Sequence, residues 1–174
     1  MIIGITGKSG AGKSYLAKLV AEFGLDVEYI DIDEIGHNLL DEYSVASKIQ
    51  EKLGIKVSST NRKELADTIF KNRNGEMKII SDIMWETMRE RIGRRIGNSD
   101  KKHIVLDWIL LPHTDLFKRC DVKILVKPCD EELRKEKVCK RDNITEEKLN
   151  LRDSASIKYN EADFDYVVIN NYNS

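Results

Sequence analysis

Several residue types and patterns are scarce in this sequence, and each scarcity argues against a class of protein. Three cysteines with no C-x-x-C pair make a zinc site unexpected, and we interpret them as reduced thiols of a cytoplasmic protein. No apolar run is long enough for a transmembrane helix, and the sequence opens on a core strand, not a charged and then apolar leader. A net charge of −1 argues against a general nucleic-acid or membrane-surface binder.

Residues 2–14 combine a short apolar run with a glycine-rich segment. The isoleucines of residues 2–5 predict a buried strand, and residues 7–14 match G-x-x-x-x-G-K-[ST] at every fixed position. Leu16, Val20 and Phe23 follow at helical spacing. Strand, loop and helix therefore come in the order of a phosphate-binding loop, although an ordinary glycine-rich turn is the alternative.

The residue types of this loop suit a nucleotide triphosphate. Backbone amides and the helix dipole meet phosphate oxygens, while glycines let the backbone approach closely. Lys13 places a cation on the β/γ-phosphates, and the Ser14 hydroxyl can bind Mg²⁺. We expect ATP to contact the residues Lys8, Ser9, Gly10, Ala11, Gly12, Lys13, Ser14 and Tyr15.

Aspartates follow two further predicted strands, at the strand ends where ligands bind in doubly wound sheets. The strand over residues 27–30 ends in Asp31 and Asp33, and Asp33 could accept a proton from an attacking hydroxyl or help to hold the metal through water. The alternative is that Asp33 caps a helix starting near Glu34. The strand over residues 103–107 ends in Asp107, a Walker B pattern in which the carboxylate orients Mg²⁺ or its water.

Residues 34–98 contain helical patterns and no convincing strand. We expect broken helix over residues 34–60, a polar turn at 58–61, a short helix at 65–70 and a long helix at 77–96. The long helix carries an apolar stripe that includes three methionines, which we interpret as a core face. Its other face is either solvated or presents one arginine to an anionic acceptor, the candidates being Arg89, Arg91, Arg94 and Arg95.

The last third of the chain predicts two more strands with a basic helix pair between them. The strands cover residues 122–126 and 165–169. The helix pair over residues 131–152 carries basic residues that a mobile lid could close over a triphosphate, or that a surface hairpin would expose to solvent. These basic residues are Lys137, Lys140, Arg141 and Arg152; Asn170 and Asn171 end the last strand, near where a base could lie.

Five apolar runs separated by helices predict a single α/β domain with a five-stranded parallel doubly wound sheet. Its core would comprise residues 1–33, 99–140 and 161–174. A helical insertion over residues 34–98 and a lid at about residues 140–160 would flank the cleft.

The chain resembles dephospho-coenzyme A kinases, which are P-loop proteins of the nucleoside monophosphate kinase-like group. Besides the glycine loop, the matching segments are residues 29–35, 61–70, 105–111, 140–147 and 165–171. The resemblance implies that the chain transfers the γ-phosphate of ATP, with Mg²⁺, to the ribose 3′-hydroxyl of dephospho-coenzyme A.

The resemblance also implies roles for individual residues. The second aspartate of the Asp-x-Asp pair acts as the base in this family, and that position is Asp33 here. Arg141 would be a lid arginine on the phosphates, with Arg152 as a second candidate, and the helical insertion would hold the acceptor. The predicted catalytic residues are therefore Lys13, Asp33 and Arg141. As a separate expectation, the protein is a monomer or a weak homo-oligomer.

Three substitutions, one of them of a residue pair, differ from the family pattern on the acceptor and lid side. His37 stands where the family has arginine, Trp85-Glu86 where it has His-Pro, and Ser156 where it has glutamine. Two alternatives therefore remain: a P-loop kinase of a nucleoside, nucleotide or other small hydroxyl compound, and a non-catalytic ATP-binding regulatory relative. ATP consumption that no acceptor stimulates would favour the second.

Overall fold

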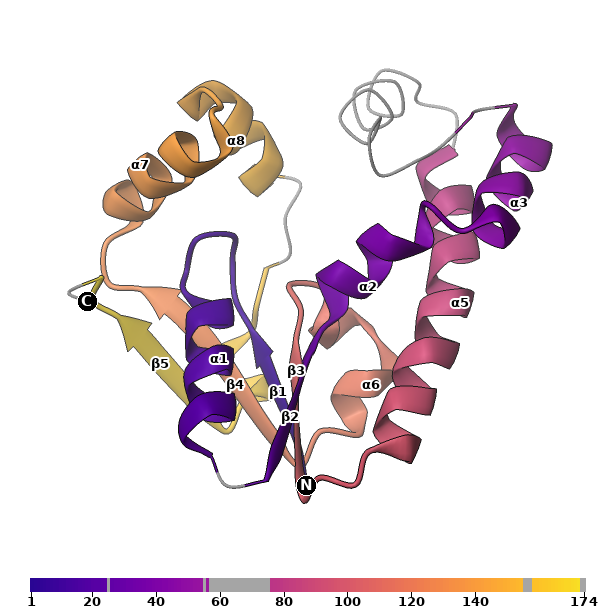
Figure 1. Ribbon diagram of the computed structural model, residues 1–174. Coiled ribbons are helices and arrows are strands. Elements are labelled where there is room, and N and C mark those ends of the chain that lie inside the picture. Colours follow the sequence, from indigo (N-terminus) through magenta and orange to yellow (C-terminus); the bar gives the residue numbers. More distant parts are fainter. Residues whose placement is uncertain (25, 55, 57–75, 155–157, 173–174) are drawn as a thin grey trace. The chain divides into compact units, whose positions relative to one another are not determined.

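Five parallel strands form one sheet in a computed structural model that describes residues 1–24, 26–54, 56, 76–154 and 158–172. The strands follow the order β2-β3-β1-β4-β5 across the sheet (Figure 1). The central strand β1 pairs with β3 on one side and β4 on the other. The predicted parallel α/β class is confirmed, and the strands are β1 (Ile2–Thr6), β2 (Val27–Asp31), β3 (His103–Asp107), β4 (Val122–Pro128) and β5 (Tyr166–Asn170).

The chain divides into two units, a sheet unit of residues 1–31 and 100–174 and a helical unit of residues 32–99. In the described residues, the helical unit contains α2 (Ile32–Leu39), α3 (Tyr43–Leu53) and α5 (Glu76–Asn98). The helices of the sheet unit are α1 (Lys13–Phe23), α6 (Asp115–Lys118), α7 (Glu131–Asp142) and α8 (Glu146–Ser154), with short 3-10 turns η1 (Leu111–His113) and η2 (Glu161–Asp163).

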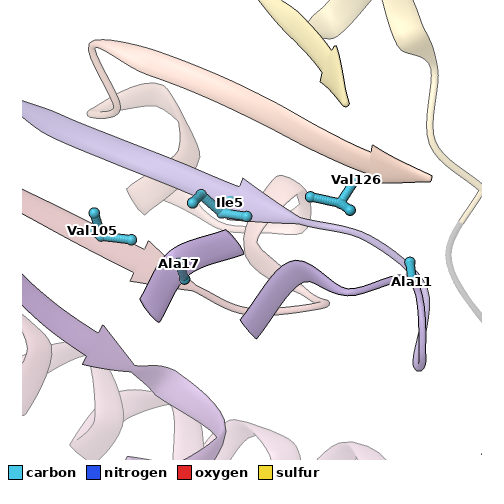
Figure 2. Close-up of a cluster of buried hydrophobic side chains, with 5 residues drawn as sticks. All are labelled: Ile5, Ala11, Ala17, Val105 and Val126. Carbon is cyan, nitrogen blue, oxygen red and sulfur yellow. The ribbon is translucent and has the colours of Figure 1, made fainter. Parts of the chain in front are cut away.

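A cluster of small and branched side chains joins α1 to one face of the sheet (Figure 2). Its fully or almost fully buried members are Ile5, Ala11, Ala17, Val105 and Val126. Leu16 and Val20 of α1 pack against this cluster, as their helical spacing predicts. Phe23, the third residue of the predicted apolar face, does not pack against the cluster. It lies in the last turn of α1 and is 77% exposed.

The opposite face of β1 is covered by the segment that joins β3 to β4. A Cβ atom placed at Gly4 would lie 2.7 Å from Cys120 Sγ and 2.9 Å from Leu111 Cδ2. The Cys120 thiol is buried and donates to the Leu116 carbonyl at 3.3 Å, and burial raises its pKa to about 11. The sheet is therefore covered on both faces at β1, and the packing at Gly4 leaves no room for a larger side chain on this second face.

We expect Gly4→Ala to lower the free energy of unfolding by about 1–3 kcal/mol, because the added methyl group overpacks a filled layer. The entropy that alanine removes from the unfolded chain offsets this by no more than about 1 kcal/mol. Urea unfolding followed by circular dichroism measures the change. Gly93→Ala in α5 is the control, because a Cβ there would have no atom within 4 Å apart from its chain neighbours and the nearby helix backbone, and alanine favours the helix. Equal midpoints for the two variants would contradict the packing argument.

The helical unit has its own apolar core. It consists of residues from α2, α3 and α5, with Ile32, Leu39, Ile49 and Ile92 fully buried. The predicted long helix is confirmed as α5, and its apolar stripe is buried at Ile80, Met88 and Ile92. The expected turn at residues 58–61 and the expected helix at 65–70 lie outside the described residues.

Two of the arginines proposed as acceptor contacts form ion pairs within the helical unit. Arg91 pairs with Glu42, and Arg94 pairs with Glu90 one turn earlier in α5. These pairs favour the solvated-face interpretation for Arg91 and Arg94. No helix in the described part of the chain is long and apolar enough to cross a membrane.

The predicted basic helix pair is confirmed as α7 and α8. Asp130 caps α7, since its carboxylate accepts from the amides of Glu132 and Leu133 at 2.8 and 3.0 Å. Asn143 ends α7 in the left-handed conformation, with φ 52°. After a short connection, α8 runs back along α7 (Figure 1). Both helices belong to the sheet unit, as does the glycine loop.

Candidate active site

The loop between β1 and α1 has the backbone that an anion-binding site needs. Gly10 and Gly12 have φ of 79° and 98°, in the left-handed region that favours glycine. The first hydrogen bond of α1 runs from the Leu16 amide to the Gly12 carbonyl at 3.0 Å. The amides of residues 13–15 precede it and therefore find no carbonyl inside the helix. These amides and the positive end of the helix dipole can meet an anion.

A pocket of about 250 Å³ lies between this loop and α7. Three of its side chains are cationic, one from α1 and two from α7. Positive side chains around free helical amides suit a polyanion such as a triphosphate. The lining residues are Gly10, Gly12, Lys13, Ser14, Tyr15, Lys137, Val138 and Arg141.

The remaining loop residues predicted to contact ATP have other contacts in the structure. Lys8 Nζ forms an ion pair with Glu131 Oε1 at 3.0 Å. The Ser9 hydroxyl accepts from Arg141 Nη2 at 3.1 Å, and the Ala11 side chain is buried in the core beneath the loop. The Lys8 side chain is thus directed to α7, while Ser9 links the loop to the arginine that lines the pocket.

The two predicted lid arginines meet at one carboxylate. Arg141 Nε donates to Asp142 Oδ1 at 2.8 Å, and Arg152 Nη1 donates to Asp142 Oδ2 at 3.0 Å. The two hydrogen bonds lower the pKa of Asp142 below its usual range, and the bond from Arg141 has the larger effect. Arg141 lines the pocket. Arg152 does not line it, but is linked to Arg141 because both donate hydrogen bonds to Asp142.

Asp107 lies at the carboxyl end of β3, beside β1, and is 2% exposed. Its Oδ2 accepts from the Tyr29 hydroxyl at 3.1 Å, while its Oδ1 is buried without a hydrogen-bond partner among the described residues. Burial raises the pKa of Asp107, and the Lys13 ammonium and the Ser14 hydroxyl oppose this rise without cancelling it. An unsatisfied carboxylate oxygen close to Lys13 and Ser14 fits a magnesium ligand set.

We expect Asp107→Asn to stabilise the metal-free protein at neutral pH, because the buried carboxylate costs free energy when ionised. The folded state binds the Asp107 proton more tightly than the unfolded state does, so this contribution to stability falls as pH rises from about 4. In EDTA at pH 7 the variant should melt a few degrees higher, and the difference should shrink toward pH 4. Thermal unfolding at both pH values measures this; a variant less stable at pH 7 would contradict it.

Two predicted site residues, Asp33 and Asn171, lie in the first turn of α2 and directly after β5. Helix α2 begins at Ile32, so Asp33 lies in its first turn and does not cap a helix starting at Glu34, which corrects that alternative. Asp33 follows the end of β2 by two residues and belongs to the helical unit. Asn171 directly follows β5 and is exposed. The roles of Asp33 and Asn171 therefore stay predictions.

Three further residues contact the loop or line the pocket. Lys137 was predicted only as one of the basic residues of the helix pair, Asn170 only as lying near a base, and no role was predicted for Tyr172. Lys137 lines the pocket, four residues before Arg141 on the same face of α7, and this spacing could have indicated it. Asn170 Nδ2 donates to the Ala11 carbonyl at 3.1 Å, and the Tyr172 hydroxyl donates to the Gly10 carbonyl at 2.8 Å. Nothing in the local sequence indicates these two contacts, because more than 150 residues separate the partners.

Comparison with known proteins agrees with this geometry. A family model described as dephospho-CoA kinase matches residues 1–174. The chain belongs to the dephospho-CoA kinase family. The dephospho-CoA kinase of Fusobacterium nucleatum is 32% identical over 151 residues, which cover 84% of this chain and 76% of the relative. That of Agrobacterium fabrum is 32% identical over 155 residues, covering 87% and 78%.

Solved structures show the same fold at lower sequence identity. A Thermus thermophilus protein has a TM-score of 0.79 at 22% identity, with 98% of this chain and 88% of that chain covered. Dephospho-CoA kinase from Campylobacter jejuni has a TM-score of 0.62 at 20% identity, with 97% and 87% covered. The family resemblance inferred from the sequence is confirmed, and the glycine-loop pocket lies in a dephospho-CoA kinase fold.

Proposed function

We propose that this chain transfers the γ-phosphate of ATP to the ribose 3′-hydroxyl of dephospho-coenzyme A. The observation that carries the proposal is the cationic pocket at the glycine loop, in a chain that matches the dephospho-CoA kinase family over its whole length. In the reaction, the bond between the γ-phosphorus and the β–γ bridging oxygen breaks, and a bond to the 3′-oxygen forms. The hydroxyl proton passes to a base, and the products are ADP and coenzyme A.

The pocket residues would hold and stabilise the triphosphate. The free amides of α1 and the Lys13 ammonium bind the phosphate oxygens, while Arg141 offsets negative charge on the group in transfer. Lys137 faces the same pocket and adds a third cation. Arg152 keeps Arg141 in place through their shared partner Asp142, so its effect on ATP should be weaker than that of Arg141.

Ser14 and Asp107 are the residues that would hold Mg²⁺. Asp107 offers a buried oxygen that lacks a partner among the described residues, and Ser14 has a hydroxyl next to it. No group of three His, Cys, Asp or Glu side chains with metal-binding geometry occurs in the described ranges, which suits an ion bound mainly by phosphate oxygens and water. When bound, Mg²⁺ neutralises charge that develops on the β- and γ-oxygens.

Asp33 is the proposed base for the acceptor hydroxyl. It lies in the first turn of α2, immediately beyond the end of β2, where the chain passes from the sheet unit to the helical unit. A carboxylate is able to accept a proton from a hydroxyl group within hydrogen-bond reach. We further propose that the helical unit holds dephospho-coenzyme A, that the base of ATP lies near Asn171, and that the reaction takes place in the cytoplasm.

A coupled ADP-release assay over a panel of acceptors tests the proposed function. Dephospho-coenzyme A should stimulate ADP release, and coenzyme A should not, because its 3′-oxygen already carries a phosphate. Adenosine, AMP and pantetheine test for other hydroxyl acceptors, and ATP alone tests for slow hydrolysis. Equal ADP release with and without every acceptor would exclude the kinase proposal and favour a nucleotide-binding regulatory protein.

A further inference from the structure

Three consecutive carbonyls of the glycine loop accept hydrogen bonds from side chains outside the loop. The Ser9 carbonyl accepts from Arg134 Nη1 at 2.9 Å. The Gly10 carbonyl accepts from the Tyr172 hydroxyl at 2.8 Å, and the Ala11 carbonyl accepts from Asn170 Nδ2 at 3.1 Å. The donors come from α7 and from the end of β5, and we refer to Arg134, Asn170 and Tyr172 as the loop clamp.

The clamp fixes amides as well as carbonyls. In a planar trans peptide the carbonyl of one residue and the amide of the next point in opposite directions. Holding the carbonyl of residue 9 therefore directs the amide of Gly10 away from Arg134, and holding that of residue 11 directs the amide of Gly12 away from Asn170. The amide of Ala11 donates to the Lys8 carbonyl at 3.1 Å and closes the turn. Gly10 and Gly12 line the pocket, so the amides that the clamp orients belong to residues of the anion site.

The Arg134 guanidinium is held rigidly. It is fully buried, and it forms ion pairs with Glu131 at 2.9 Å and with Asp153 of α8. Glu131 also pairs with Lys8, so the two cations and the two carboxylates balance in charge. The Nε and Nη2 groups of Arg134 donate to the two carboxylates, so this buried guanidinium cannot turn away from the Ser9 carbonyl without breaking its ion pairs.

Asn170 at the end of β5 and Tyr172 just beyond it are also held in place by neighbouring contacts. Tyr172 adopts φ 56°, and its amide donates to Asn170 Oδ1 at 3.0 Å. Lys137 Nζ lies 5.1 Å from the centre of the Tyr172 ring, which links the ring to the pocket cation on α7. A Cβ atom at Gly12 would lie 2.3 Å from Asn170 Nδ2, so this amide group packs directly against the loop.

We propose that Arg134, Asn170 and Tyr172 are positioning residues that preorganise the glycine loop for the phosphates of ATP. They act through the loop amides and do not touch the phosphates themselves. The inference rests on the proposed use of ATP and extends it to residues beyond the glycine motif. It requires that loss of a clamp hydrogen bond weakens the binding of phosphates but leaves the binding of the acceptor and the stability of the fold nearly unchanged.

Tyr172→Phe is the sharpest test, because it removes one hydroxyl and keeps the ring beside Lys137. We expect the Kd for ATP and for inorganic tripolyphosphate to rise roughly three- to tenfold, as for one lost hydrogen bond. The KM for ATP should rise in parallel, while the KM for dephospho-coenzyme A and the melting temperature should hardly change. Tyr166→Phe is the matched control, since Tyr166 begins β5, the strand that precedes Tyr172, and is 61% exposed.

Asn170→Ala provides a second variant for calorimetric titration with ATP and tripolyphosphate, and it should show the same selective loss. Unchanged affinities in both variants would overturn the inference and leave the proposed function intact. Selective loss in a protein that binds ATP but phosphorylates no acceptor would support the clamp and overturn the kinase proposal. A wild-type chain that binds neither ATP nor tripolyphosphate would overturn both.

Discussion

Replacing Lys13 with alanine should lower kcat by about 10³-fold or more and weaken ATP binding. Lys13 lines the pocket at the first position of α1, where its ammonium can follow negative charge onto the β- and γ-phosphates. A charge-stabilising group in a preorganised site contributes about 10²–10³-fold to the rate, and Lys13 also contributes to nucleotide binding. Steady-state ADP release with saturating dephospho-coenzyme A, together with calorimetric titration of ATP, measures both effects.

The control for this experiment is Lys18→Ala, five residues further along α1. Lys18 is exposed and does not line the pocket, so its removal changes the net charge equally without removing a pocket residue. We expect wild-type kcat and Kd for this variant. A similar loss in both variants would mean that net charge, and not the position of Lys13, explains the result.

Replacing Asp33 with asparagine should lower kcat by 10²-fold or more and leave the Kd for ATP unchanged. Asparagine has the same shape and can still accept a hydrogen bond, but it cannot take the proton of the attacking hydroxyl. Loss of a general base lowers a rate by about 10²–10⁴-fold. Single-turnover transfer from ATP to dephospho-coenzyme A isolates the chemical step, so slow product release cannot hide the effect.

Glu34→Gln is the matched control for Asp33→Asn. Both residues lie in the first turn of α2, and both substitutions remove one negative charge from the start of the helix. They therefore lose the same favourable interaction with the helix dipole. A kcat for Asp33→Asn within a factor of three of that for Glu34→Gln would remove Asp33 from the mechanism.

The sheet and the glycine loop could be predicted from the sequence because their signals are local. The isoleucines of β1 run directly into the loop motif, and the apolar residues of β3 end in Asp107. Such patterns depend on neighbours in the chain, whereas the order of the strands across the sheet was not predicted. The same reasoning failed for Phe23, because helical spacing alone does not show that this side chain is exposed in the last turn of α1.

The contacts that shape the pocket could not be predicted, because they join distant parts of the chain. Tyr29 and Asp107 are 78 residues apart, and Arg134 and Ser9 are 125 apart. In the sequence, Arg134 is one of many charged residues of α7, and this pattern predicts an exposed side chain. In the structure it is fully buried. Its burial depends on Asp153, Glu131 and the Ser9 carbonyl all reaching the same point, which only the folded chain brings about.

The buried thiol beneath β1 makes this chain convenient for site-directed labelling. Since the pKa of Cys120 is about 11 and its sulfur is packed against Gly4, little thiolate forms there at neutral pH and a maleimide dye has no access. Cys129, between β4 and α7, is exposed. Cys139 of α7 is only half-buried and would have to be replaced. A fluorophore could then be attached at Cys129, at the base of α7, to report on that helix when nucleotide is added, without removing the interior cysteine.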